Sequence, residues 1–127
     1  MELEELTQQI IAAAIEVHKE LGAGLLESSC ERCLCHELSL RGIPHVCELQ
    51  LPVNYKGMRL DCGCRVDIVV ANAVVLEMKA VERVEKIHKA QLLIYLRLGG
   101  WKVGLLINFN VPVLKDGIKR RVLLAQD

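Results

Sequence analysis

The segment RVDIVVANAVVLEMK, residues 65–79, predicts a β-hairpin at the centre of the fold. It contains two apolar stretches that each fit a β-strand, separated by a short turn centred on Asn72. If the strands pair as a hairpin, residues equally far from Asn72 face each other, so Asp67 lies opposite Glu77. This register requires an odd-numbered loop or a bulge, because an even-numbered loop would move the two carboxylates to opposite faces.

Side chains alternate between the two faces of a strand, so the hairpin would have one mixed face and one apolar face. The mixed face carries Arg65, Asp67, Val69, Val75, Glu77 and Lys79. The opposite face carries Val66, Ile68, Val70, Val74, Leu76 and Met78. We expect this second face to pack into the core.

Two opposed carboxylates, those of Asp67 and Glu77, would repel each other unless a cation lies between them. A divalent ion removes the conflict, and carboxylate oxygens suit Mg²⁺ or Mn²⁺. Lys79 would add an ammonium group that could stabilise developing negative charge or orient a metal-bound water. The alternative is a solvated outer face with ordinary charges, on which Lys79 partly neutralises Glu77.

The chain around this hairpin alternates between helical and strand patterns. Apolar spacing predicts helices over residues 3–21, 26–41 and 84–98. Strands are expected over residues 47–54, 58–70, 73–80, 101–108 and 118–124. The order ααβββαββ is typical of an α/β or α+β fold with a mixed sheet. The length of 127 residues fits one domain, which we expect to span residues 1–127.

Composition and charge exclude several classes of protein. Lys and Arg number 16, as do Asp and Glu, so the zero net charge excludes nucleic-acid binding by bulk electrostatics alone. Aromatic residues make up 3% of the chain, too few for a platform that stacks single-stranded bases. Charges interrupt every window of about twenty residues, so no membrane span is expected. The acidic start MELEELTQQ differs from a secretion signal, and we expect a cytoplasmic protein.

The predicted helix over residues 84–98 carries one polar residue within an apolar stripe. The stripe consists of Val84, Ile87, Gln91, Ile94 and Leu98. A buried amide needs hydrogen-bond partners, so Gln91 either satisfies a backbone group or points at a site on the sheet. His88 could line the same edge, although a surface or packing role is commoner for a single histidine.

The chain contains six cysteines: Cys30, Cys33, Cys35, Cys47, Cys62 and Cys64. We expect reduced, mostly buried thiols, because the apolar content is high and no export signal is present. Cys62 and Cys64 share a strand face with Val66 and Ile68, which we expect to point into the core. As alternatives, Cys30, Cys33, Cys62 and Cys64 could hold zinc or an iron–sulfur cluster, or cysteines could form a disulfide.

Two basic clusters could contact a phosphate backbone beside a metal site. They consist of Arg83, Lys86 and Lys89, and of Lys115, Lys119, Arg120 and Arg121. Solvated lysines at a helix start and a chain end are the alternative, and Glu82 and Glu85 partly cancel the first cluster. Because so small a chain has little surface for sequence-specific recognition, a homodimer or a partner protein would fit.

Several motifs resemble those of the GxxExxY proteins, a bacterial and archaeal family. Residues 24–30, GLLESSC, resemble the family signature, with Cys30 in place of its tyrosine. Residues 65–67, RVD, and 76–80, LEMKA, resemble its version of the PD-(D/E)XK nuclease motif. Its following helix, next strand and C-terminal tail are similar to residues 88–96, 104–109 and 115–120.

The resemblance implies a restriction-endonuclease-like core, a mixed β-sheet flanked by helices. It implies that Asp67 and Glu77 bind the metal with help from Glu27, that Lys79 is the catalytic lysine and that Gln91 positions water or phosphate. The activity it implies is hydrolysis of phosphodiester bonds in DNA or RNA with Mg²⁺ or Mn²⁺. The alternatives are a non-catalytic module that binds nucleic acid or protein, and a cysteine-ligated metal protein.

Overall fold

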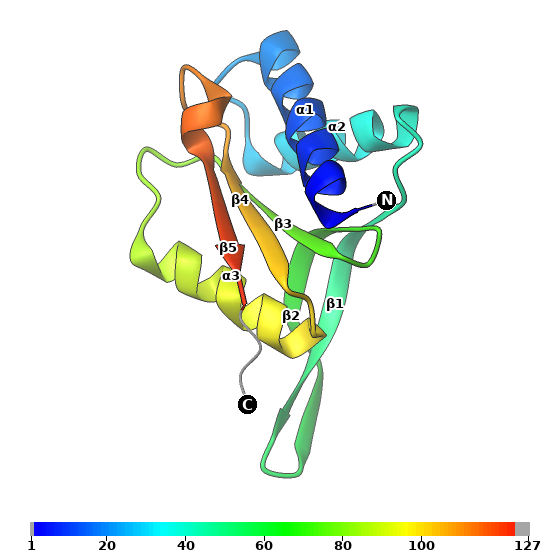
Figure 1. Cartoon of the computed structure of the whole chain (residues 1–127). Coiled ribbons are helices and arrows are strands. Elements are labelled where there is room, and N and C mark those ends of the chain that lie inside the picture. Colours follow the sequence, from blue (N-terminus) through cyan, green and yellow to red (C-terminus); the bar gives the residue numbers. More distant parts are fainter. Residues whose placement is uncertain (1, 124–127) are drawn as a thin grey trace.

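In the part of the chain that the structure describes, five strands form one sheet whose spatial order follows the chain, β1-β2-β3-β4-β5 (Figure 1). The computed structural model describes residues 2–123. The strands are β1 (His45–Tyr55), β2 (Met58–Val70), β3 (Val74–Lys79), β4 (Val103–Asn108) and β5 (Ile118–Val122). The helices are α1 (Leu3–Leu21), α2 (Glu27–Leu40), α3 (Lys86–Gly99) and the short 3₁₀ helix η1 (Leu114–Gly117). Leu124, the predicted end of the last strand, lies outside the described residues.

The sheet is mixed, as the order of elements predicted. β3 and β4 are parallel, whereas β1–β2, β2–β3 and β4–β5 are antiparallel. A tight turn cannot join two parallel neighbours, so α3 forms the crossover between β3 and β4. The expected order ααβββαββ and the mixed α/β sheet flanked by helices are confirmed, and no helix among the described residues is long and apolar enough to cross a membrane.

The β2–β3 turn confirms the predicted register. Ile68 pairs with Leu76, Val69 with Val75 and Val70 with Val74, so the connection is the odd loop of residues 71–73. Ala71 and Asn72 both have a φ of 51°, a left-handed conformation that asparagine tolerates better than most residues. The indole N–H of Trp101 donates to Asn72 Oδ1 at 3.0 Å and ties this turn to the start of β4.

Helices cover both faces of the sheet (Figure 1). One apolar cluster packs α1 and α2 against Ile68, Val70, Val74, Leu76, Met78, Val103, Leu105 and Ile107. The other packs Leu92, Tyr95 and Leu96 of α3 against Leu51, Val66, Val69, Val75 and Leu106. Burial from both sides explains why β3 and β4 are almost continuously apolar.

The prediction that Val66 shares a face with Ile68 and Val70 is wrong. Val66 packs on the α3 side, whereas Ile68 and Val70 pack on the α1–α2 side, so strict alternation fails at Asp67. On the neighbouring strand, Glu48 has a φ of 54°, far from the extended value. The β1–β2 pair is therefore distorted at the level of Asp67, and side-chain alternation holds only for regular strands.

The predicted face of α3 is also wrong. Leu92, Tyr95 and Leu96 are buried, whereas Ile87, Ile94 and Leu98 of the predicted stripe are exposed. The helix is apolar around most of its circumference, so periodicity alone does not fix the buried face. Gly104 on β4 lies directly against this face, since a Cβ atom at this position would be 2.8 Å from Leu92 Cδ1.

The cysteines differ from the expected reduced and buried set. Cys35 on α2 and Cys47 on β1 form a disulfide. The loop between α2 and β1 brings the two cysteines together, so their local sequence patterns do not predict the bond. Cys62 is exposed, and Cys64 is half-buried against the apolar cluster under α3. The β1–β2 hairpin that carries both cysteines projects past α3 (Figure 1). Cys30 is buried, as expected.

Candidate metal centre

Two carboxylates occupy the point at which β2 and β3 separate. The ladder between these strands ends at the Ile68–Leu76 pair, one position before Asp67 and Glu77. The backbone N–H of Asp67 donates to Glu77 Oε2 at 3.0 Å, and that of Met78 donates to Asp67 Oδ2 at 2.8 Å. Each carboxylate therefore satisfies a backbone group of the opposite strand where the regular ladder has stopped. This reciprocal exchange holds the two acids side by side.

Burial dominates the electrostatics of this pair. Glu77 is 4% exposed, and burial followed by the charge of Asp67 raises its pKa to about 8. Burial also raises the pKa of Asp67, while the Met78 N–H and the charges of Lys79 and Arg65 oppose the shift. Without a cation, the site thus favours the protonated form of at least one carboxyl group.

A third carboxylate, that of Glu31 on α2, lies beside Asp67 and was not predicted. Glu31 is 5% exposed, and burial, hydrogen bonding with Glu48 and the charge of Asp67 raise its pKa to about 8. Arg65 counters these acids, with its Nη1 atom 3.8 Å from Glu48 Oε1. The sequence signal for its burial was its position on α2, directly after Cys30 and beside the apolar stripe that Cys30 forms with Leu34 and Leu38.

Glu27, the predicted helper, lies one helical turn before Glu31. Its Oε2 atom accepts a hydrogen bond of 3.3 Å from the backbone N–H of Ala80, the residue that follows Lys79. Glu27 also lines a surface hollow with residues 24–28, Ala80 and Asn110. The structure therefore brings Glu31 against Asp67 and places Glu27 beyond the end of β3.

On the other side of the sheet, α3 contributes Tyr95 to the surroundings of Glu77. Burial, followed by the charge of Glu77, raises the pKa of Tyr95 to about 12. Gln91 is half-buried one turn before Tyr95, on the same side of the helix. His88 instead caps α3, because its Nδ1 atom accepts a 2.9 Å hydrogen bond from the backbone N–H of Glu85. This finding supports the packing role for His88.

The chain directly after Lys79 is clamped by a buried amide. Asn108 is 3% exposed, donates from Nδ2 to Val81 O at 2.9 Å and accepts from the Val81 N–H at 3.0 Å. Lys79 itself pairs with Asn108 in the parallel β3–β4 ladder. The clamp fixes the end of β3 and hence the base of the Lys79 side chain.

A comparison with known families agrees with this arrangement. A model described as the PD-(D/E)XK nuclease superfamily matches residues 4–121, almost the whole chain. The chain belongs to this superfamily. Comparisons with curated proteins and with solved structures give no match.

The site contains the charged residues of the PD-(D/E)XK pattern. Residues 77–79, EMK, match its second part, while Val66 precedes Asp67 in place of the proline. Hard oxygen ligands at Asp67, Glu77 and Glu31 fit Mg²⁺ or Mn²⁺ better than a softer metal. A bound divalent ion would also stabilise the ionised forms that burial disfavours. The residues present therefore fit the metal that this superfamily typically uses.

Proposed function

We propose that this PD-(D/E)XK protein is a divalent-metal-dependent nuclease that hydrolyses phosphodiester bonds in DNA or RNA. The supporting observation is the reciprocal hydrogen bonding of Asp67 and Glu77, with Lys79 close enough for its charge to lower the pKa of both acids. Within the superfamily, we assign the chain to the GxxExxY family on residues 24–30, and we infer one cytoplasmic domain.

Asp67 and Glu77 would hold the ion, with Glu31 as the third carboxylate and Glu27 as a further acid near the end of β3. When bound, Mg²⁺ or Mn²⁺ would supply Lewis acidity toward a phosphoryl oxygen and make water a stronger nucleophile. Lys79 would place a fixed positive charge beside the phosphorus centre, where negative charge grows in the transition state. Gln91, half-buried on α3, would orient water or phosphate.

Exposed basic residues at the start of α3 and around β5 support a nucleic-acid substrate. Lys86 on α3 and Lys115 and Lys119 near β5 are exposed, whereas Arg120 is engaged with Glu4 at 3.2 Å. These lysines would position a phosphate backbone without contributing sequence selection. A homodimer or partner protein would extend this small surface.

A cleavage assay tests the proposal. The chain is incubated with single- and double-stranded DNA and RNA in Mg²⁺ or Mn²⁺, beside Glu77→Gln and the control variant Glu20→Gln on the exposed side of α1. We expect cleavage by the wild type and the control, abolished by chelator and reduced at least about 100-fold in Glu77→Gln. Glutamine keeps an oxygen that can accept from the Asp67 N–H, so the variant should fold.

Two results would contradict the nuclease assignment. The first is the absence of cleavage by folded wild-type chain on all four substrates. The second is equal, metal-dependent cleavage by Glu77→Gln. Binding of nucleic acid without cleavage would instead identify the non-catalytic module.

A further inference from the structure

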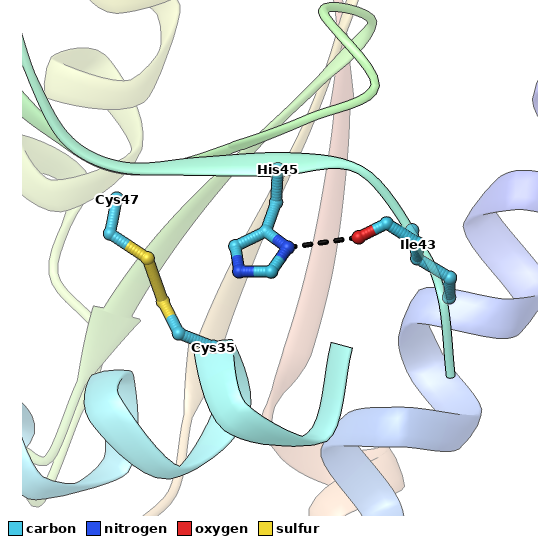
Figure 2. Close-up of a disulfide and its surroundings, with 4 residues drawn as sticks. All are labelled: Cys35, Ile43, His45 and Cys47. Carbon is cyan, nitrogen blue, oxygen red and sulfur yellow. Dashed lines mark hydrogen bonds between the residues drawn. A yellow bond between two sulfur atoms is a disulfide. The ribbon is translucent and has the colours of Figure 1, made fainter. Parts of the chain in front are cut away.

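A second group of metal-binding side chains lies between α2 and β1, apart from the carboxylates (Figure 2). It consists of Cys35 near the middle of α2 and of His45 and Cys47 at the start of β1. One ligand atom from each residue lies within 4.8 Å of the other two, and Cys35 and His45 are half-buried. Two sulfurs and an imidazole nitrogen are ligands of zinc, whereas Mg²⁺ and Mn²⁺ prefer oxygen.

A hydrogen bond to the backbone fixes the tautomer of the His45 imidazole. Its Nδ1 atom lies 2.9 Å from the carbonyl oxygen of Ile43. Since a carbonyl only accepts hydrogen bonds, Nδ1 carries the proton, and Nε2 of the neutral ring keeps a free lone pair. Figure 2 shows the ring between the Ile43 carbonyl and the two sulfurs. Metal-binding histidines characteristically donate their second ring N–H to such a carbonyl.

We propose that Cys35, His45 and Cys47 of the reduced chain bind one Zn²⁺, and that the disulfide is the alternative, metal-free state of this site. A dithiol reductant supplies the two electrons and two protons that convert the disulfide to two thiols, and is itself oxidised to a disulfide. Binding of Zn²⁺ then releases the two thiol protons, while Nε2 donates its lone pair without losing a proton. Water fills the fourth position of the tetrahedron.

The position of this site gives it a structural consequence. Cys35 lies one helical turn after Glu31, and Cys47 directly precedes Glu48, the hydrogen-bond partner of Glu31. Either the disulfide or the zinc ion therefore ties α2 to β1 beside these acids. The reduced, metal-free chain lacks this tie. The proposal rests on the Cys35–His45–Cys47 geometry and does not depend on nuclease activity.

Co²⁺ substitution tests the zinc site, because a thiolate bound to Co²⁺ gives a charge-transfer absorption that oxygen ligands cannot give. The reduced, metal-free chain is titrated with Co²⁺ and then with Zn²⁺, beside Cys35→Ser, Cys47→Ser and His45→Gln. The matched controls Cys33→Ser and His36→Gln change the same residue types within α2. Glu77→Gln is added to remove the carboxylate site from the comparison.

We expect the thiolate absorption to correspond to one Co²⁺ per reduced wild-type chain and to be lost when one equivalent of Zn²⁺ displaces that ion. Loss of Cys35 or Cys47 should lower Zn²⁺ affinity by about 100-fold or more, whereas the controls and Glu77→Gln should keep the absorption. In an alkylation assay read by mass spectrometry, Zn²⁺ should protect Cys35 and Cys47 specifically. Circular dichroism verifies that each variant is folded.

The proposal is overturned if the folded, reduced wild-type chain gives no thiolate absorption. It is equally overturned if Cys35→Ser and Cys47→Ser keep the absorption at wild-type affinity, or if Zn²⁺ protects other cysteines instead. Failure of the nuclease assay would leave these outcomes unchanged.

Discussion

The carboxyl groups of Glu31 and Glu77 combine almost complete burial with the neighbouring charge of Asp67. Both have a pKa raised to about 8, well above the ordinary glutamate value. Such groups release their protons readily only when a cation replaces the lost solvation. For these residues, burial therefore disfavours the charged forms in the metal-free protein, and a bound cation would stabilise them.

The raised pKa values predict that the metal-free chain loses stability as the pH rises. Between about pH 4.5 and pH 8, the folded state binds more protons at Glu31 and Glu77 than the unfolded state does. The free energy of unfolding therefore falls with increasing pH in this window. Thermal unfolding of the oxidised chain in chelator should show a Tm lower by about 5 °C or more at pH 8 than at pH 5.

In Glu77→Gln this pH dependence should become weaker, because one of the two titrating groups is gone. A Tm that rises across the window, or a slope that the substitution leaves unchanged, would show that these acids do not titrate in the way described.

Glu31 and Glu27 should differ in how much each contributes to Mn²⁺ affinity. We expect Glu31→Gln to weaken Mn²⁺ binding by about tenfold or more, since Glu31 lies against Asp67. Glu27→Gln should weaken it less, because the carboxylate of Glu27 accepts from the Ala80 N–H instead. Isothermal titration calorimetry of both variants gives the comparison, and a larger loss for Glu27→Gln would reverse our assignment.

At the scale of the element, local patterns predicted the strands better than the buried faces. The register of β2 and β3 follows from a short turn and alternating residues, all within one segment of sequence. The buried side of α3 depends on packing against other strands, where Gly104 lies against Leu92, and the change of face at Asp67 accompanies the distortion at Glu48 in β1. Such influences from distant segments do not appear in the spacing of apolar residues along a single helix or strand.

The buried face of α3 is tested by a pair of alanine substitutions. Leu92→Ala should lower the free energy of unfolding by about 2–5 kcal/mol, because the side chain is fully buried. Ile94→Ala should cost less than about 1 kcal/mol, because Ile94 is 46% exposed. Chemical denaturation measures both. Equal costs, or a larger cost at Ile94, would support the face predicted from periodicity.

At the scale of the whole molecule, the site forms because β2 leaves β3 and turns into the β1–β2 hairpin (Figure 1). The gap in the ladder admits Asp67 and Glu77, while Glu31 reaches it from α2 and Tyr95 lies near it on α3. The sequence predicted the opposed acids and Lys79, which lie close together along the chain. Glu31, Tyr95 and the Cys35–Cys47 disulfide could not be predicted, because tertiary packing alone brings them to their partners.

Binding of Mn²⁺, measured by electron paramagnetic resonance, tests the central claim that this gap is a divalent-metal site. The wild type, Glu77→Gln and Lys79→Ala are compared in their folded, oxidised state. We predict one ion per wild-type chain, a strong loss of affinity in Glu77→Gln, and binding in Lys79→Ala at least as tight as in the wild type, because removal of the lysine removes a competing positive charge. Mn²⁺ binding that is absent from the folded wild type, or equal in Glu77→Gln, would contradict the account.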